Sequence, residues 1–97
     1  MSKPSLSKIS IIVPTYKEAQ NIDILTRRIH KTMTEYKISY EIIFVDDDSR
    51  DGIEKIISNL STEGLNVRLI QRKDERGLST AVLRGFSEAK GEILVCM

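Results

Sequence analysis

The sequence predicts an α/β fold in which helices flank a parallel sheet. Short β-branched runs alternate with stretches of helical periodicity along the 97 residues, in the order β-α-β-α-β-α-β. Such alternation implies parallel strands joined by right-handed crossovers. A second strand is expected at Tyr40–Val45, and its continuous apolar run Ile42–Val45 is that of a strand covered on both faces. It ends in three acids, Asp46, Asp47 and Asp48, where open α/β sheets bind their ligands.

The composition is that of an ordinary globular domain, with 40% hydrophobic and 30% charged residues. A net charge of +1 gives no case for a nucleic acid partner. The single cysteine, Cys96, excludes a disulfide framework, and its apolar surroundings predict a buried, reduced thiol. No stretch approaches the roughly 20 apolar residues of a membrane span.

The first strand and helix follow a polar start. Residues 1–8 are rich in Ser and Lys and predict a disordered tail, which leaves residues 9–97 as one domain. Ile9–Val13 predicts a short strand that Pro14 ends, because proline cannot donate to a central ladder. A helix is expected from Asn21 to about Tyr36, with His30 on its polar side at the surface. Its inward face has helical spacing and consists of Ile22, Leu25, Ile29, Met33 and Tyr36.

A second helix is expected directly after the acidic turn. Asp51 and Glu54 have the spacing of a capping box at its start. Its apolar positions follow the i, i+3, i+4, i+7 pattern and are Ile53, Ile56, Ile57 and Leu60. A turn at residues 61–64 then leads into a third strand, Val67–Ile70.

The last predicted elements are a helix and a strand. Leu78–Lys90 has helical spacing, and Gly91 fits the position of its C-cap. Glu92–Met97 has the pattern of a fourth strand with no turn after it. We therefore expect the chain to be a truncated part of a longer protein.

Several kinds of protein place acids at a strand end. A dinucleotide-binding domain needs Gly-x-Gly-x-x-Gly after the first strand, and the stretch Pro14–Asn21 contains no glycine. A phosphorylated receiver domain, a signalling module, carries its acids on the first strand and a phospho-acceptor Asp at a later strand end. Here a full βα unit precedes the acids, and Gln71 follows the third strand. These departures count against both classes and favour a solvated acidic turn or a nucleotide-sugar enzyme.

Three blocks of sequence, in order and at the usual spacing, resemble family 2 glycosyltransferases of the GT-A fold. They are most similar to the branch of dolichyl-phosphate (polyprenyl-phosphate) mannosyltransferases. The blocks are Ile11–Glu18 with Asn21, Ile42–Gly52, and Arg76–Ala81 followed by Arg84–Phe86 and Ala89–Gly91.

The resemblance implies that residues 9–97 form the Rossmann-like nucleotide-binding half of a GT-A fold, incomplete in this chain. It implies a hexosyltransferase that moves a sugar, mannose from GDP-mannose, to a polyprenyl or dolichyl phosphate. The expected place is the cytoplasmic face of a membrane, and we expect this fragment to be inactive alone. Two alternatives stay open: a UDP-sugar as donor, and a non-catalytic nucleotide-binding or receiver-like signalling module.

The resemblance also implies which residues hold the nucleotide sugar. An aromatic ring can pack on a base, and a carboxylate can accept hydrogen bonds from ribose hydroxyls or base N–H groups. Asp47 is implied as the carboxylate at the base. The residues carried over from the family's motifs are Pro14, Tyr16, Glu18, Val45 and Asp47.

The neighbouring polar residues receive other expectations. Asp46 is expected to brace the loop by accepting backbone N–H bonds, and Asp48 is given no contact. Ser49 and Asp51 are expected as turn and cap residues. Basic residues in the charged loop could face a pyrophosphate or a lipid phosphate, although a solvated loop is an equal alternative. These candidates for phosphate contact are Arg72, Lys73 and Arg76.

The family's reaction implies a divalent metal, Mg²⁺ or Mn²⁺, that neutralises the diphosphate leaving group. Its ligands belong to an Asp-x-Asp motif at the end of the fourth strand, which is expected just beyond Met97. The sequence therefore predicts neither a metal ligand nor a catalytic residue within these 97 residues.

Overall fold

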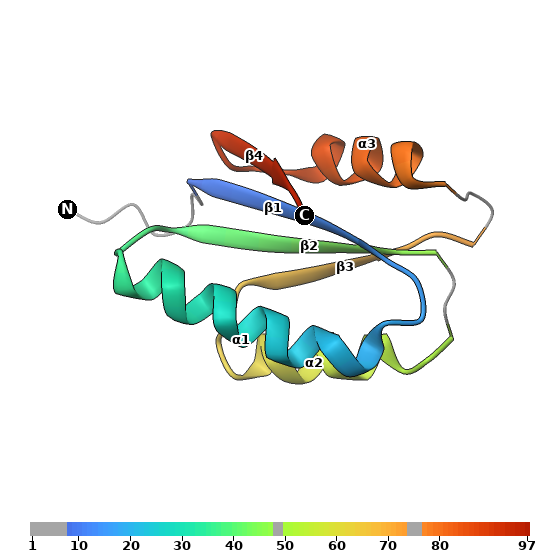
Figure 1. Ribbon diagram of the computed structural model, residues 1–97, viewed down its shortest axis with the longest axis horizontal. Coiled ribbons are helices and arrows are strands. Elements are labelled where there is room, and N and C mark those ends of the chain that lie inside the picture. Colours follow the sequence, from blue (N-terminus) through green and yellow to red (C-terminus); the bar gives the residue numbers. More distant parts are fainter. Residues whose placement is uncertain (1–7, 48–49, 74–76) are drawn as a thin grey trace.

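The computed structural model describes residues 8–47, 50–73 and 77–97. The described residues form one parallel sheet of four strands in the order β3-β2-β1-β4 (Figure 1). Helices alternate with the strands along the chain, so the predicted order and the α/β fold class are confirmed. The elements are β1 (Ile9–Thr15), α1 (Ala19–Glu35), β2 (Tyr40–Asp46), α2 (Ile53–Thr62), β3 (Val67–Gln71), α3 (Leu78–Glu88) and β4 (Ile93–Cys96).

The helices cover opposite faces of the sheet because the chain reverses direction. From β1 to β3 each strand is added on the same side, and right-handed crossovers place α1 and α2 on one face. The chain then returns past β2 and β1 to β4, and the same handedness places α3 on the other face (Figure 1). The reversal lies between β1 and β4, and ligands of such sheets bind beside the carboxyl ends there.

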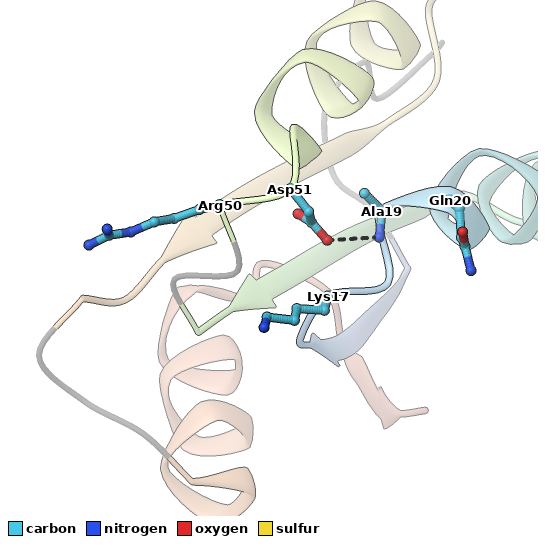
Figure 2. Close-up of a pocket in the computed structure, with 5 residues that line it drawn as sticks. All are labelled: Lys17, Ala19, Gln20, Arg50 and Asp51. Carbon is cyan, nitrogen blue, oxygen red and sulfur yellow. Dashed lines mark hydrogen bonds between the residues drawn. The ribbon is translucent and has the colours of Figure 1, made fainter.

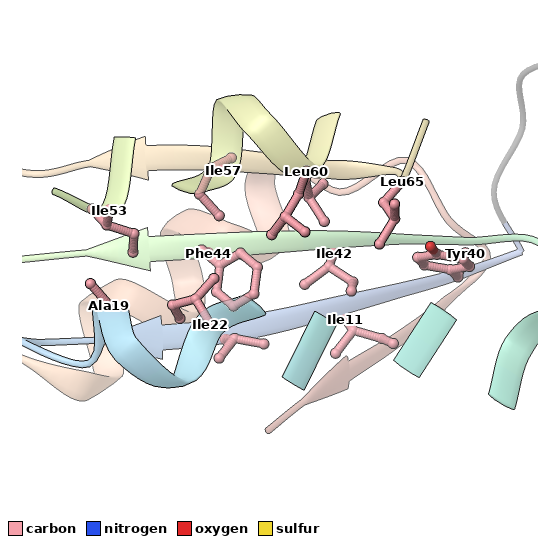
Figure 3. Packing of buried hydrophobic residues seen from close by; sticks show 12 residues of the cluster. Ile11, Ala19, Ile22, Tyr40, Ile42, Phe44, Ile53, Ile57, Leu60 and Leu65 are labelled. Carbon is pink, nitrogen blue, oxygen red and sulfur yellow. The ribbon is translucent and has the colours of Figure 1, made fainter. Parts of the chain in front are cut away.

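Two apolar cores follow from the alternation of side chains along β1 and β2. Phe44 and Ile42 point toward α1 and α2, whereas Ile43 and Val45 point toward α3. Figure 3 shows the larger core, where Phe44 lies between the two helices and the sheet. All seven residues of β2 are buried, which confirms that this strand is covered on both faces.

The prediction that Pro14 ends the first strand is wrong. Strand β1 continues through Pro14 to Thr15. The carbonyl of Ile12 accepts the Met97 N–H on the β4 side, and that of Thr15 accepts the Asp47 N–H on the β2 side. Successive residues of a strand face opposite sides, so Pro14 faces the β4 side, like Ile12. In the described sheet β4 pairs with β1 only as far as Ile12, so the missing N–H costs no ladder bond.

Two expectations about α1 are wrong. Tyr36 is 70% exposed, because the helix ends at Glu35 and Tyr36 lies beyond the face that contacts the sheet. His30 is half-buried rather than fully at the surface, and its Nδ1 lies 2.7 Å from the hydroxyl of Tyr40. Tyr40 is the first residue of β2 and lies under this part of α1. Its hydroxyl therefore reaches His30 at the border of the polar face of the helix.

The predicted capping box of α2 is also wrong. Gly52 is the N-cap residue, with a left-handed φ of 86°, and no side chain caps this helix. The Asp51 carboxylate instead accepts the backbone N–H of Ala19 at 3.2 Å, as Figure 2 shows. One acid from the β2–α2 loop therefore caps the neighbouring helix α1. Helix α2 also runs to Thr62, two residues into the predicted turn.

Strand β4 is exposed along its whole length in the described structure. It pairs with β1 on one side and forms an edge of the four-stranded sheet. Cys96 is therefore an exposed free thiol, contrary to the predicted buried one.

Gly91 is not the C-cap of α3, because the helix ends at Glu88 and Ala89 takes the cap position. The glycine instead lies against β1, where its N–H donates to the hydroxyl of Ser10 at 2.8 Å. A Cβ at this position would stand 2.8 Å from the Ser10 backbone nitrogen, so the close approach requires glycine.

The disordered tail predicted for residues 1–8 lies outside the described residues except for Lys8. The backbone of Lys8 takes part in the sheet edge, since its N–H donates to the Ser39 carbonyl. Its own carbonyl accepts the N–H groups of Glu92 and Ile93. Lys8 is therefore joined to the amino end of the sheet.

Candidate functional site

Four of the five predicted nucleotide-binding residues line one cavity of about 240 Å³. It lies at the carboxyl edge of the sheet, where β1 and β2 end. The end of β1 and the start of α1 supply most of the wall, β2 supplies one acid, and α3 supplies a small apolar residue. The lining residues are Pro14, Thr15, Tyr16, Glu18, Asp47 and Ala81.

Val45, the fifth predicted residue, does not line this cavity. Its side chain is fully buried in the smaller core, beside Ile12 and Ala81. Any contact of Val45 with a ligand would have to come from its backbone, which pairs with Pro14 across the strands. The contact predicted for Val45 stays a prediction.

Tyr16 offers an exposed aromatic face at the mouth of the cavity. It is 47% exposed, and the ammonium of Lys17 lies 5.3 Å from its ring centroid. Lys17 has a left-handed φ of 55°, which is costly for a residue with a side chain. Glu18 is exposed at the start of α1, so its carboxylate is open to a ligand.

Asp47 is held by a two-pronged ion pair with Arg72. The Nε of Arg72 donates to Oδ1 of Asp47 at 2.7 Å, and its Nη2 donates to Oδ2 at 3.0 Å. The Arg72 side chain is 1% exposed, whereas that of Asp47 is 17% exposed and reaches the cavity. The guanidinium also donates to the Thr80 hydroxyl at 2.8 Å and to the Gly77 carbonyl at 3.0 Å.

These contacts argue against a phosphate contact by Arg72. Its guanidinium is buried among protein acceptors, so it does not stand at the mouth of the site as predicted. Lys73 is exposed, and Arg76 lies outside the described residues. The phosphate contacts of Lys73 and Arg76 stay predictions.

Asp46 connects the two central strands. It is fully buried, and its Oδ1 accepts the hydroxyl of Thr15 at 3.1 Å. The backbone N–H bonds expected for Asp46 stay a prediction. Its carbonyl also accepts the Arg72 N–H at 2.8 Å. Asp46 thus fixes the strand ends, while Asp47 faces the cavity. Asp48 and Ser49 lie outside the described residues.

A second cavity of about 490 Å³ lies beside the start of α1. Figure 2 shows its lining, in which Lys17 and Arg50 come from the loops after β1 and β2. Arg50, like Lys17, has a left-handed φ, here 56°. The hydrogen bond from Ala19 to Asp51 joins the two loops at this point.

The described residues contain no group of three or more His, Cys, Asp or Glu side chains placed to hold a metal ion. Asp46 and Asp47 are adjacent in sequence but turn to different partners, Thr15 and Arg72. Within the described part of the chain, no helix combines the length and the apolarity needed to cross a bilayer.

The sequence did not reveal the contacts that join the start of α3 to the site. Gly77 and Thr80 accept from Arg72, and Ala81 lines the cavity. They belong to the third block that resembled the family, but nothing in their spacing paired them with Arg72. The missing signal is tertiary, because Asp47 and Arg72 are 25 residues apart.

The comparison with known families identifies the class of protein to which this fold belongs. The model of glycosyl transferase family 2 matches residues 10–97. The chain belongs to this family.

Within the family, the chain is similar to dolichol-phosphate mannosyltransferases. It is 53% identical over 89 residues to that of Saccharomyces cerevisiae, covering 91% of this chain and 33% of the yeast protein. It is 43% identical over 90 residues to that of Pyrococcus furiosus, covering 93% of this chain and 25% of the relative. The chain thus spans between a quarter and a third of the length of these relatives.

Solved structures share the fold. A mannosyltransferase from Pyrobaculum calidifontis, in complex with GDP-Man and Mn²⁺, has a TM-score of 0.68 and 25% identity. The match covers 94% of this chain and 27% of that one. Mannosyl-3-phosphoglycerate synthase from Rubrobacter xylanophilus has a TM-score of 0.71 and 21% identity. This match covers 92% of this chain and 29% of the synthase. These neighbours show that the sheet and its helices have part of the fold of GT-A glycosyltransferases.

Proposed function

We propose that this chain is the nucleotide-sugar-binding part of an enzyme that transfers mannose from GDP-mannose to a polyprenyl phosphate of the dolichyl type. One observation carries the proposal: Pro14, Tyr16, Glu18 and Asp47 line a single cavity at the carboxyl edge of the sheet. The 53% identity to the yeast dolichol-phosphate mannosyltransferase supports the acceptor. The likeness to a mannosyltransferase that holds GDP-Man supports the donor.

The cavity residues have the chemistry that a nucleoside diphosphate needs. The exposed ring of Tyr16 can stack on a base. The Asp47 carboxylate can accept N–H bonds from the base edge, and Glu18 can accept hydroxyl bonds from the ribose. These residues bind and orient the donor.

The transfer itself is an in-line displacement at the anomeric carbon. An oxygen of the acceptor phosphate forms the new bond as the bond to the nucleoside diphosphate breaks, and the electron pair leaves with the diphosphate. A phosphate acceptor is already ionised at pH 7, so it needs no strong general base.

A divalent cation belongs to the proposal, because Mn²⁺ accompanies GDP-Man in the Pyrobaculum enzyme. It would neutralise charge on the leaving diphosphate. The described residues of this chain include no cluster that fits it, so none of them is assigned to the metal. Ligands of an Asp-x-Asp motif beyond Met97 are part of the same proposal.

The acceptor also sets where the enzyme would act. A polyprenyl chain is insoluble in water, so its phosphate is presented at a membrane surface. We place the reaction at the cytoplasmic face, because nucleotide sugars of this kind are expected on that side.

Calorimetry with GDP and UDP, each with and without Mn²⁺, tests the donor. We expect GDP to bind more tightly than UDP. Asp47→Ala should weaken GDP binding by about 10- to 100-fold, the effect of losing hydrogen bonds to a charged group. Asp48→Ala is the control and should bind as the unaltered protein does.

Other results would count against the proposal. Tighter binding of UDP would favour the alternative of a UDP-sugar donor. Absence of binding by either nucleotide would remove the basis for a glycosyltransferase site in this cavity. Equal losses for Asp47→Ala and Asp48→Ala would mean that Asp47 is not the base contact.

A further inference from the structure

We propose that Arg72 is a positioning residue, which sets the affinity for the nucleotide base by holding the Asp47 carboxylate and does not bind phosphate. This inference rests on the proposed function, because it assigns a role within the same cavity. It replaces the phosphate contact that the sequence predicted for Arg72.

The first argument is the difference in burial between the two partners. Asp47 lines the cavity, whereas Arg72 does not and its side chain is only 1% exposed. A ligand in the cavity can therefore reach the carboxylate but not the guanidinium behind it. Arg72 can influence a ligand only through the groups that it holds.

The second argument is the geometry of the pair. Nε and Nη2 of Arg72 donate to separate oxygens of Asp47, at 2.7 and 3.0 Å. Two parallel bonds fix the plane of the carboxylate as well as its position. A carboxylate has about four lone-pair sites, so two remain for N–H donors of a base. The pair thus presents an acceptor whose direction is already set before a ligand arrives.

The third argument is that the same guanidinium also holds the start of α3, which supplies part of the cavity wall. It donates to the Thr80 hydroxyl at 2.8 Å and to the Gly77 carbonyl at 3.0 Å, at the start of α3. This helix supplies Ala81 to the cavity. One side chain therefore sets the spacing between the acid at the end of β2 and the wall formed by α3.

A lysine could not replace Arg72 in this role. Its ammonium keeps the charge but lacks the planar fork that engages both oxygens of Asp47. Arg72→Lys should therefore fold and still weaken GDP binding, by about 10-fold. Arg68→Lys is the matched control, because Arg68 lies on β3, which Arg72 directly follows, and donates to a different acid, Glu41. The control should bind GDP as the unaltered protein does.

Guanosine separates a positioning role from a phosphate contact, because it carries the base and ribose without phosphate. If Arg72 acts through Asp47, Arg72→Lys weakens guanosine and GDP by the same factor. If Arg72 binds phosphate, GDP binding weakens and guanosine binding is unchanged, which would overturn the inference. Calorimetry gives the dissociation constant for GDP, and an NMR titration gives that for guanosine.

A double-mutant cycle gives an independent check. Asp47→Asn removes the charged acceptor, which leaves Arg72 only its bonds to Thr80 and Gly77. Adding Arg72→Lys to Asp47→Asn should then cost clearly less GDP affinity than Arg72→Lys costs in the unaltered protein. Additive losses would show that Arg72 acts on the nucleotide by another route, against the inference.

One measurement needs no variant and covers the case in which Arg72→Lys does not fold. The Nε–H resonance of Arg72 should shift when guanosine is added and stay unchanged with inorganic pyrophosphate. The opposite response would contradict the inference. If the unaltered protein binds neither GDP nor guanosine, the proposed function itself fails. Unimpaired binding by folded Arg72→Lys, beside a protein that binds GDP, would overturn the inference alone.

Discussion

Gly91 is a residue whose identity is set by a neighbour distant in sequence. Its N–H donates to the Ser10 hydroxyl, and that hydroxyl donates to Glu41 at 2.6 Å. The N–H of Lys90 reaches the same carboxylate at 2.7 Å. The turn before β4 is therefore joined to the first two strands through hydrogen bonds that require close contact.

Gly91→Ala should destabilise the fold. The added Cβ would lie 2.6 Å from the Ser10 hydroxyl oxygen and 2.8 Å from its backbone nitrogen. Overpacking of this kind costs about 1–3 kcal/mol, and backbone cannot move aside as easily as a flexible side chain. Urea unfolding measures the loss. Lys90→Ala, at an exposed neighbour whose backbone bond is kept, should stay within about 0.5 kcal/mol of the unaltered protein. Equal stability of Gly91→Ala would show that the turn can shift.

Asp47 shows how far residue-level prediction of the site could go. Its place at a strand end and its resemblance to the family's motif singled it out from its two acidic neighbours. The structure places it in the cavity, and Asp46 in the strand pairing. Its pairing with Arg72 could not be read from the sequence, because an arginine in a charged loop looks the same whether solvated or buried.

Helix α1 begins at a cap supplied by another element. Its first N–H, from Ala19, is accepted by Asp51 in the loop before α2. A carboxylate near a helix N-terminus also interacts favourably with the helix dipole. The start of α1 carries Glu18 at the cavity, so this bond connects the loop after β2 to the wall of the site.

Asp51→Ala should therefore loosen the start of α1 rather than that of α2. We expect a loss of about 1 kcal/mol in the free energy of unfolding. Amide hydrogen exchange should become faster at residues 19–21 and not at the start of α2. Glu54→Ala, at the acid of the predicted capping box, is the control and should cost less. Faster exchange at residues 53–55 in Asp51→Ala would instead support the capping box.

At the scale of the whole molecule, Glu41 joins separate parts of the sheet. It is buried on β2 and accepts bonds from Ser10 on β1, from Arg68 on β3 and from the Lys90 N–H before β4. Burial alone would raise the pKa of the Glu41 carboxyl. The hydrogen bonds and the nearby guanidinium outweigh burial, so its pKa is lowered in the folded protein.

This shift predicts a dependence of stability on pH. A folded-state pKa below the unfolded one means that the contribution of Glu41 is present above about pH 4.3, the unfolded value. It is lost as the pH falls through the folded-state pKa. Glu41→Gln should cost about 2 kcal/mol at pH 7, and its unfolding curves should approach those of the unaltered protein in acid.

Urea unfolding between pH 3 and pH 7 measures this difference. Glu63→Gln is a surface control, since water screens the pair that Glu63 forms with Arg27. It should change the pH profile much less than Glu41→Gln. A constant gap between Glu41→Gln and the unaltered protein at every pH would contradict the assignment to Glu41.

The sequence by itself determined the order of the elements and the parallel sheet. It also indicated the buried strand β2 and four residues that line the cavity. These features are local: apolar periodicity reports which side of each element is covered, and strand ends report where ligands bind. The predicted boundaries of the helices and strands differ from the observed ones by a few residues, because the last turn of a helix or the end of a strand depends on the elements packed against it.

Only the tertiary structure decided which distant residues meet. Arg72 faces Asp47, Asp51 caps α1, and Gly91 lies against Ser10, over separations of 25, 32 and 81 residues. It also placed Pro14 inside β1, on the side where no ladder bond is lost. Such contacts follow from the strand order β3-β2-β1-β4, which brings the loops after β1, β2 and β3 together at the carboxyl end of the sheet and places the start of β4 beside that of β1. Periodicity carries no information about that order, because every strand repeats with the same period.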